Sequence, residues 1–120
     1  MPIVIFIAKE NLKKHPLFEK IFFFEGSATD CINEVDEIID LVFIDANKKP
    51  MVDYYEQVMP KLRKGGIIIA DDVLWKGEVI NPDCERKEMM DNFNQKVKND
   101  PRVENVLLPL RNGLNLIYKL

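Results

Sequence analysis

Acidic side chains stand directly after two apolar runs that are separated by one helix length. The run Leu41–Ile44 is followed by Asp45, and the run Ile67–Ala70 is followed by the pair Asp71–Asp72. In an open parallel sheet, ligands bind outside the carboxyl ends of the strands, so both acidic groups are expected at one edge. Carboxylate oxygens there suit a hard divalent cation, and the nearby Lys48 suits a base beside a substrate. This segment therefore predicts a metal-assisted reaction that includes proton abstraction.

Each of these residues also has an ordinary structural explanation. An Asp at a strand end commonly caps a helix or begins a turn. Lys48 belongs to a Lys-Lys pair, which is typical of a solvated surface. The spacing of the whole set, rather than any single residue, favours a functional site.

The motifs around these residues resemble those of the metal-dependent O-methyltransferases that use S-adenosylmethionine, including the catechol and caffeoyl-CoA enzymes. The resemblance covers about residues 25–120. It rests on EGSATD (Glu25–Asp30), FIDANK (Phe43–Lys48), DYYE (Asp53–Glu56), KLRKGGIIIADDVLWKGEV (Lys61–Val79) and PLRNGLNLIYK (Pro109–Lys119). The implied reaction is methyl transfer to the hydroxyl of a small phenolic or catechol-like substrate.

The resemblance also assigns roles to individual residues. It implies Mg²⁺ or another divalent cation on Asp45, Asp71 and Asp72, with Lys48 as the general base. A cation there would disfavour the ammonium form of Lys48, which is the direction that a base needs.

The remaining implied roles concern the cofactor and the substrate. S-adenosylmethionine is expected beside Ser27, Ala28 and Asp45, and Trp75 is expected in the wall of the substrate pocket. For Ser27 the alternative is a plain helix N-cap. For Trp75 the alternative is a partly buried core position.

Several positions depart from the family pattern. The family's E-x-G-x-x-x-G loop, which cradles the methionine part of the cofactor, has no counterpart, since the glycines lie at positions 26, 65, 66, 77 and 113. Asp72 stands where Asn is common, and Ser27, Met51 and Asn112 also replace common family residues. The resemblance thus implies weak or absent cofactor binding by this chain. The alternative function is a non-catalytic remnant that serves as a binding or assembly module.

Composition restricts the class of protein. The 120 residues are 47% hydrophobic and 31% charged, which predicts a single globular domain, residues 1–120. The resemblance implies that this domain is a truncated methyltransferase-like domain. A net charge of −3 argues against non-specific nucleic-acid binding. Cys31 and Cys84 lack metal-site spacing and predict reduced thiols in a cytoplasmic protein. The run Pro2–Ala8 is too short to span a membrane.

The apolar runs predict a three-layer, Rossmann-like α/β fold with a mostly parallel sheet and one antiparallel strand near the C-terminus. The expected strands are Ile3–Ala8, Ile21–Glu25, Leu41–Asp45, Ile67–Ala70, Val103–Leu108 and Leu114–Lys119. The expected helices are Asn11–Phe18, a segment with Ile32, Val35 and Ile39 on one face, a segment from Val52 to Leu62 that stops at Lys64–Gly66, and a segment with Met89, Phe93 and Val97 on one face.

The family's missing central strand leaves a gap in this sheet. Closing the gap predicts the strand order 2-1-3-4-6-5, with Ile3–Ala8 paired in parallel to Leu41–Asp45. Both runs lack alternation, so each is expected to have neighbours on both sides. A domain-swapped homodimer that fills the gap is the alternative.

Overall fold

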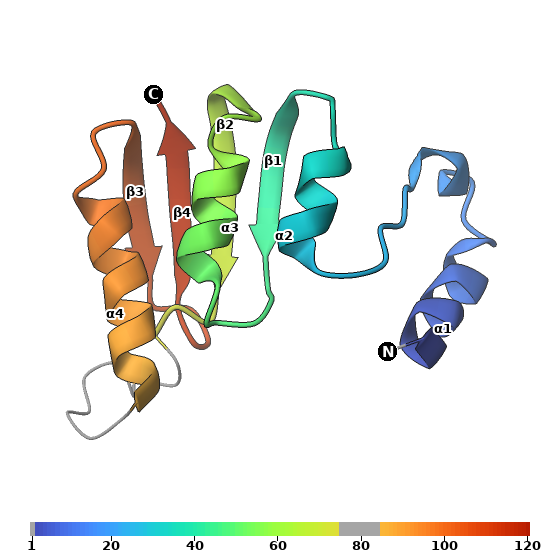
Figure 1. Cartoon of the computed structure of the whole chain (residues 1–120), viewed down its shortest axis with the longest axis horizontal. Coiled ribbons are helices and arrows are strands. Elements are labelled where there is room, and N and C mark those ends of the chain that lie inside the picture. The colour runs from blue at the N-terminus through green and yellow to red at the C-terminus, as the bar shows by residue number, and fades with distance from the viewer. Residues whose placement is uncertain (1, 75–84) are drawn as a thin grey trace.

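The computed structural model describes residues 2–74 and 85–120, and its centre is a four-stranded sheet with helices packed against it (Figure 1). The strands are β1 (Ile39–Ile44), β2 (Leu62–Asp71), β3 (Val103–Leu108) and β4 (Leu114–Lys119). The helices are α1 (Pro2–Leu12), α2 (Ala28–Cys31), α3 (Met51–Val58) and α4 (Glu85–Lys98), with short 3₁₀ turns η1 (Phe18–Lys20) and η2 (Ile32–Glu34).

The sheet has the order β1-β2-β4-β3. Strands β1 and β2 are parallel, and β4 is antiparallel to both of its neighbours, so β1, β2 and β3 share one direction. The predicted α/β class, with a mostly parallel sheet and one antiparallel strand, is confirmed. The last four strands of the predicted order, 3-4-6-5, are also confirmed, and β3 and β4 have the predicted bounds.

The two N-terminal strand predictions are wrong. Residues Ile3–Ala8 lie in α1, and Ile21–Glu25 belongs to no helix or strand. An apolar run forms a strand only where another strand accepts its hydrogen bonds, whereas a helix satisfies its backbone internally. The predicted pairing of residues 3–8 with β1 is therefore wrong too, and β1 is an edge strand.

Several helix bounds also differ from the predictions. Helix α1 ends at Leu12, so most of the predicted helix Asn11–Phe18 is not α-helical. Ile39 begins β1, and the helix before it is only a short α2 continued by η2. The sequence places apolar residues at helical spacing here, but Val35 is already extended.

The glycine pair after α3 forms a bulge rather than a helix stop. Helix α3 ends at Val58, just before Pro60. Strand β2 begins at Leu62, and the segment Lys64–Gly66 lies within it. Residues 62 and 67 of β2 pair with residues 39 and 41 of β1, which shows extra residues on the β2 side. Gly65 has φ +76°, a left-handed conformation that glycine adopts without steric cost.

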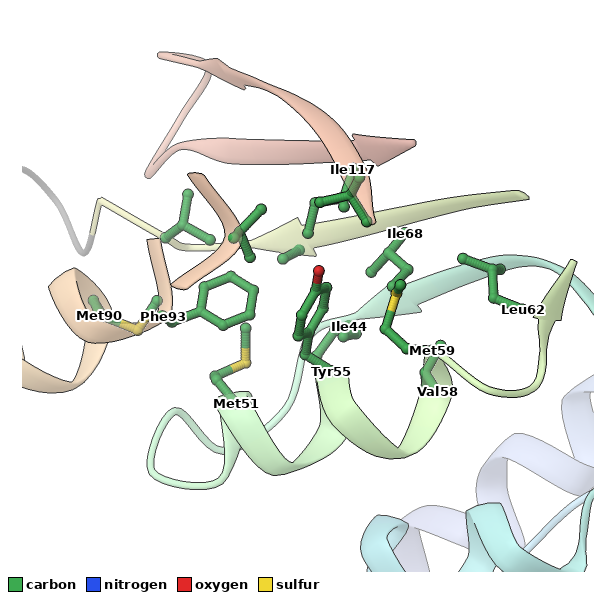
Figure 2. Close-up of a cluster of buried hydrophobic side chains, with 14 residues drawn as sticks. Ile44, Met51, Tyr55, Val58, Met59, Leu62, Ile68, Met90, Phe93 and Ile117 are labelled. Carbon is green, nitrogen blue, oxygen red and sulfur yellow. The ribbon is translucent and has the colours of Figure 1, made fainter. Parts of the chain in front are cut away.

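The core lies between the sheet and helices α3 and α4 (Figure 2). Tyr55 and Phe93 meet edge to face, with ring centroids 6.1 Å apart, and Met51 and Ile68 are fully enclosed around them. This packing fixes α3 and α4 against one face of the sheet, so the strand ends that carry the acidic residues sit on a rigid platform. No helix in the described part of the chain is long and apolar enough to cross a membrane.

Candidate functional site

The ends of β1 and β2 bring the predicted residues to one edge of the sheet. Ile44 pairs with Ala70 in parallel register, so Asp45 and Asp71 follow at matching positions. Asp45 and Asp72 then line one hollow of about 350 Å³ beside the loop that carries Lys48. Its lining consists of Asp45, Ala46, Asn47, Lys48, Lys49, Asp72 and Met89. We call it the polar hollow.

Lys48 connects the two strand ends. Its Nζ donates a hydrogen bond to the backbone oxygen of Asp71 at 2.8 Å. The loop after β1 is thereby tied to the end of β2, and the amine is held at the rim of the polar hollow. This is the position that a base needs if a substrate hydroxyl enters there.

Asp71 and Asp72 have different environments although they are adjacent. The Asp71 carboxylate is buried, and its Oδ1 accepts a hydrogen bond from the Asp72 backbone N–H at 2.8 Å. Asp72 has φ +57°, a left-handed conformation that Asp and Asn tolerate better than most residues. Asp71 therefore holds the turn that presents Asp72, and it does not line the polar hollow.

The polar hollow has the donor chemistry of a cation site. The Asp72 Oδ1 atom is buried and has no hydrogen-bond partner among residues 2–74 and 85–120. A buried carboxylate oxygen without a partner is costly, and a hard divalent cation would satisfy it together with Asp45. Within residues 2–74 and 85–120, no three His, Cys, Asp or Glu side chains are grouped closely enough to hold a metal ion. The three-carboxylate metal site thus stays a prediction.

A second hollow, of about 250 Å³, adjoins the first and shares Asp45 and Ala46 with it. Its lining consists of Ala28, Ile32, Val42, Phe43, Ile44, Asp45, Ala46, Tyr54, Gln57 and Val58. We call it the apolar hollow. Gln57 Oε1 is buried without a hydrogen-bond partner in the part of the chain that the structure describes. A flat heterocycle that carries an amino group, such as adenine, fits an apolar hollow with one unpaired acceptor.

The predicted cofactor residues differ in their positions. Ala28 and Asp45 line the apolar hollow, whereas Ser27 is exposed at the N-cap of α2. The Ser27 hydroxyl makes no cap hydrogen bond and lies 2.7 Å from the Thr29 hydroxyl. Trp75 lies outside the described residues.

Two residues of the apolar hollow were missed by sequence reasoning. Tyr54 belongs to the DYYE motif, which helped to indicate the family but assigned this residue no role in the site. Gln57 gave no signal of its own, although it follows Tyr54 by three positions and so lies on the same face of α3.

Hydrogen bonds with the β3–β4 turn and with α4 fix the segment after Asp72. Leu74 N–H donates to the backbone oxygen of Asn112 at 2.8 Å, and the Asn94 amide donates to the backbone oxygen of Val73 at 3.0 Å. The β3–β4 turn and α4 therefore both hold this segment. Its conformation is set by contacts that are distant in sequence.

A separate network ties α3 to the turn before β3. The Tyr55 hydroxyl donates to Asp100 Oδ2 at 2.8 Å, and Arg102 donates to both Asp100 oxygens. Burial and the neighbouring Asp100 raise the pKa of Tyr55 above its usual range. Hydrogen bonds from Arg102 hold the pKa of Asp100 well below its usual range. With Tyr55 neutral and Asp100 charged, the network stabilises the packing of α3 against the turn before β3.

The architecture and the two hollows together indicate the class of fold to which the chain belongs. A parallel strand pair with two hollows at its carboxyl ends, and with an antiparallel strand beside it, is the arrangement of a Rossmann-like α/β domain. The O-methyltransferase family model matches residues 3–120, and the chain belongs to this family. This confirms the family that the sequence motifs indicated.

Individual relatives agree with the family. The chain is 40% identical over 83 residues to mouse "Catechol O-methyltransferase domain-containing protein 1", covering 68% of this chain and 32% of that protein. It is 34% identical over 123 residues to "Tricin synthase 2" of Oryza sativa subsp. japonica, covering 91% of this chain and 42% of that protein. The chain thus spans less than half the length of these relatives.

Solved structures give the same result for the fold. The SAH-bound methyltransferase PaMTH1 of Podospora anserina has a TM-score of 0.90 at 27% identity, covering 100% of this chain and 58% of that chain. The O-methyltransferase of Bacillus cereus in complex with SAH has a TM-score of 0.85 at 28% identity, covering 95% of this chain and 57% of that chain.

Proposed function

We propose that the chain carries the metal-binding and proton-abstracting part of an S-adenosylmethionine-dependent O-methyltransferase acting on a small phenolic or catechol-like hydroxyl. One observation carries the proposal: the apolar and polar hollows meet at Asp45 and Ala46. A cofactor in the first hollow would thereby adjoin a cation and a base in the second. The family and the SAH-bound structural neighbours support this assignment.

The apolar hollow would receive the adenine end of the cofactor. Ala28 and Tyr54 provide apolar surface, and Gln57 Oε1 would accept a hydrogen bond from the exocyclic amino group. That bond would satisfy a buried acceptor that has no other partner among the described residues, so it would contribute more than a bond at an exposed position.

The polar hollow would hold a divalent cation through Asp45 and Asp72. When bound, such an ion supplies Lewis acidity that lowers the pKa of a coordinated hydroxyl. Asp71 contributes indirectly, because its carboxylate fixes the Asp72 backbone. Lys48, in its neutral form, would take the hydroxyl proton at Nζ, and the Asp71 backbone oxygen would orient the amine.

The second candidate is a non-catalytic module that keeps the cation site. The observation that favours it is the sequence itself, which contains no E-x-G-x-x-x-G loop to donate backbone N–H groups to the methionine end of the cofactor. We therefore expect this chain to bind S-adenosylmethionine more weakly than a micromolar dissociation constant, which corresponds to about 8 kcal/mol.

Thermal unfolding with Mg²⁺ or Ca²⁺ tests the cation site. A cation at about 100 times its dissociation constant should stabilise the folded chain by about 2.7 kcal/mol and raise Tm. Asp45→Asn and Asp72→Asn should remove this response, and so should Asp71→Ala. Asp36→Asn is the matched control, because this exposed residue precedes β1 and lies toward the opposite edge of the sheet. An equal loss in Asp36→Asn, or no response in the native chain, would refute the site.

Calorimetry with S-adenosylmethionine, with and without Mg²⁺, separates the two candidates. Binding that tightens when Mg²⁺ is present would favour the enzyme part, because the two hollows share Asp45. Cation binding without cofactor binding at any concentration would favour the non-catalytic module. A micromolar or tighter constant would show that the chain has an unrecognised site for the methionine end.

A further inference from the structure

Three asparagine side chains form a hydrogen-bonded series inside the domain. Asn115 is fully buried, and its Oδ1 accepts a hydrogen bond from Asn105 Nδ2 at 2.9 Å. Asn115 Nδ2 donates to Asn94 Oδ1 at 3.4 Å, and Asn94 Nδ2 donates to the backbone oxygen of Val73 at 3.0 Å. The series runs from β3 through β4 and α4 to the segment that follows β2. We call Asn94, Asn105 and Asn115 the amide network.

The amide network meets the chain on both sides of the acidic pair at the end of β2. On one side, Asn115 pairs in register with Ala70, the residue before the acidic pair. On the other side, Asn94 holds the backbone oxygen of Val73, the residue after the acidic pair. Ala70 and Val73 are both fully buried. The acidic pair therefore spans a short segment whose two ends are held by the same network.

The position of Asn115 is one that an apolar residue could fill. Its neighbour on the same face of β4, Ile117, is fully buried, and a buried amide is costly unless it is hydrogen-bonded. Both polar atoms of Asn115 are bonded, and a satisfied polar network of this kind restricts the core to one arrangement. Helix α4 is itself anchored by Phe93 and Val97, and Figure 2 shows Phe93 pointing into the core. The Asn94 amide is therefore held in a fixed orientation.

Asp72 needs support from its surroundings because its backbone is left-handed, with φ +57°. A residue in such a conformation persists only where the structure around it holds it there. The peptide unit that joins Val73 to Leu74 is held at both ends. Asn94 donates to its oxygen, and its N–H donates to the backbone oxygen of Asn112 at 2.8 Å. These two bonds fix the plane of the peptide and so restrict the conformation of the residue before it.

We propose that Asn94 is a positioning residue of the polar hollow, which keeps the Asp72 carboxylate at the hollow by fixing the segment that follows Asp72. Asn115 and Asn105 in turn fix Asn94. The proposal rests on the cation site of the proposed function. Asn94 is not among the residues that line the polar hollow, so it acts on a cation only through Asp72. Removing a group that orients a metal ligand typically weakens metal binding by about 10- to 100-fold.

Calorimetric titration of the full chain with Ca²⁺ separates positioning from a general loss of stability. Asn94→Ala should raise the Ca²⁺ dissociation constant about tenfold. If this variant does not fold, Asn94→Leu, which nearly keeps the side-chain volume, takes its place with the same expectation. Val97→Ala is the matched control, because it removes buried packing from the same helix but no hydrogen bond to Val73. It should lower stability and change the Ca²⁺ constant less than about twofold. Equal effects of the two variants on this constant would overturn the proposal.

Amide hydrogen exchange in the cation-free chain gives a readout that needs no cation. The Asp72 N–H donates to Asp71 Oδ1, so its exchange rate reports on the turn. Asn94→Ala should speed this exchange about tenfold, whereas Val97→Ala should change it less than about twofold. An Asp72 amide in Asn94→Ala that exchanges as in the native chain would overturn the proposal. A native chain that binds no Ca²⁺, but whose Asp72 amide responds to Asn94→Ala, would refute the cation site and still support the hold of Asn94 on Asp72.

Discussion

Replacing Asp72 by Gly should stabilise the cation-free chain and abolish its response to divalent cations. Asp72 has two unfavourable features when no cation is present. Its backbone is left-handed, with φ +57°, and its Oδ1 atom is buried without a hydrogen-bond partner within the described residues. Both features belong to a residue that lines the polar hollow. Replacing Asp72 should therefore raise the stability of the cation-free chain and weaken cation binding.

The expected magnitude follows from these two features. A left-handed conformation costs an ordinary residue about 1–2 kcal/mol, and Asp somewhat less. A buried acceptor without a partner costs about 1–3 kcal/mol. The entropy that glycine loses on folding offsets about 0.5–1 kcal/mol of the gain. We expect Asp72→Gly to raise the free energy of unfolding by about 1–2 kcal/mol.

Arg111 provides the control, because it is the other non-glycine residue in the described part of the chain with a positive φ, at +52°. It is exposed, so Arg111→Gly relieves only the backbone. This variant should change the free energy of unfolding by less than about 1 kcal/mol and keep the cation response. Urea unfolding at neutral pH, with a chelator and then with Ca²⁺, measures both quantities. A cation-free Asp72→Gly chain less stable than the native chain, or one still stabilised by Ca²⁺, would refute the reasoning.

Three further predictions concern the framework of the site. Tyr55→Phe should lower the free energy of unfolding by about 1.5–3 kcal/mol, because it removes a hydrogen bond to the charged Asp100. Tyr118→Phe, at an exposed position, should lower it by less than about 0.5 kcal/mol in the same urea assay. The lowered pKa of Asp100 means that its contribution is complete above the ordinary Asp range and is lost as pH falls below it, so Asp100→Asn should flatten the acid limb of a stability–pH curve. Gly113→Ala should destabilise the chain by about 2 kcal/mol or more and shift the backbone resonances of residue 74, because φ is +87° and a Cβ would lie 2.5 Å from Leu74 Cγ.

The strands that sequence reasoning located correctly have partners within the chain. Leu41–Ile44 and Ile67–Ala70 are apolar on both faces and pair with each other, and the C-terminal hairpin is local. Ile3–Ala8 has a similar apolar composition but no strand partner in the described part of the chain, and it is helical. Periodicity cannot separate a buried strand from a helix in so short a run, because the deciding factor is the rest of the sheet.

The site was predictable only as far as strand ends determine it. Asp45, Lys48 and Asp72 converge because parallel strands end at one edge. The separate role of Asp71 depends on the left-handed conformation of Asp72. The sequence does not show this conformation, because Asp adopts right-handed and extended conformations as well. Gln57 was missed because a single amide on a helix gives no pattern.

Broadening of amide resonances by Mn²⁺ tests the cation site most directly. A paramagnetic ion broadens nearby amides first, so a titration of the labelled chain maps where the ion binds. The proposed site predicts early loss of signals from residues 45–48 and 72, with residues 63–66 at the opposite end of β2 affected last. Asp72→Asn should weaken this pattern. Broadening that begins at the exposed acidic residues Glu34, Asp36 and Glu37, or that is uniform over the chain, would contradict the account.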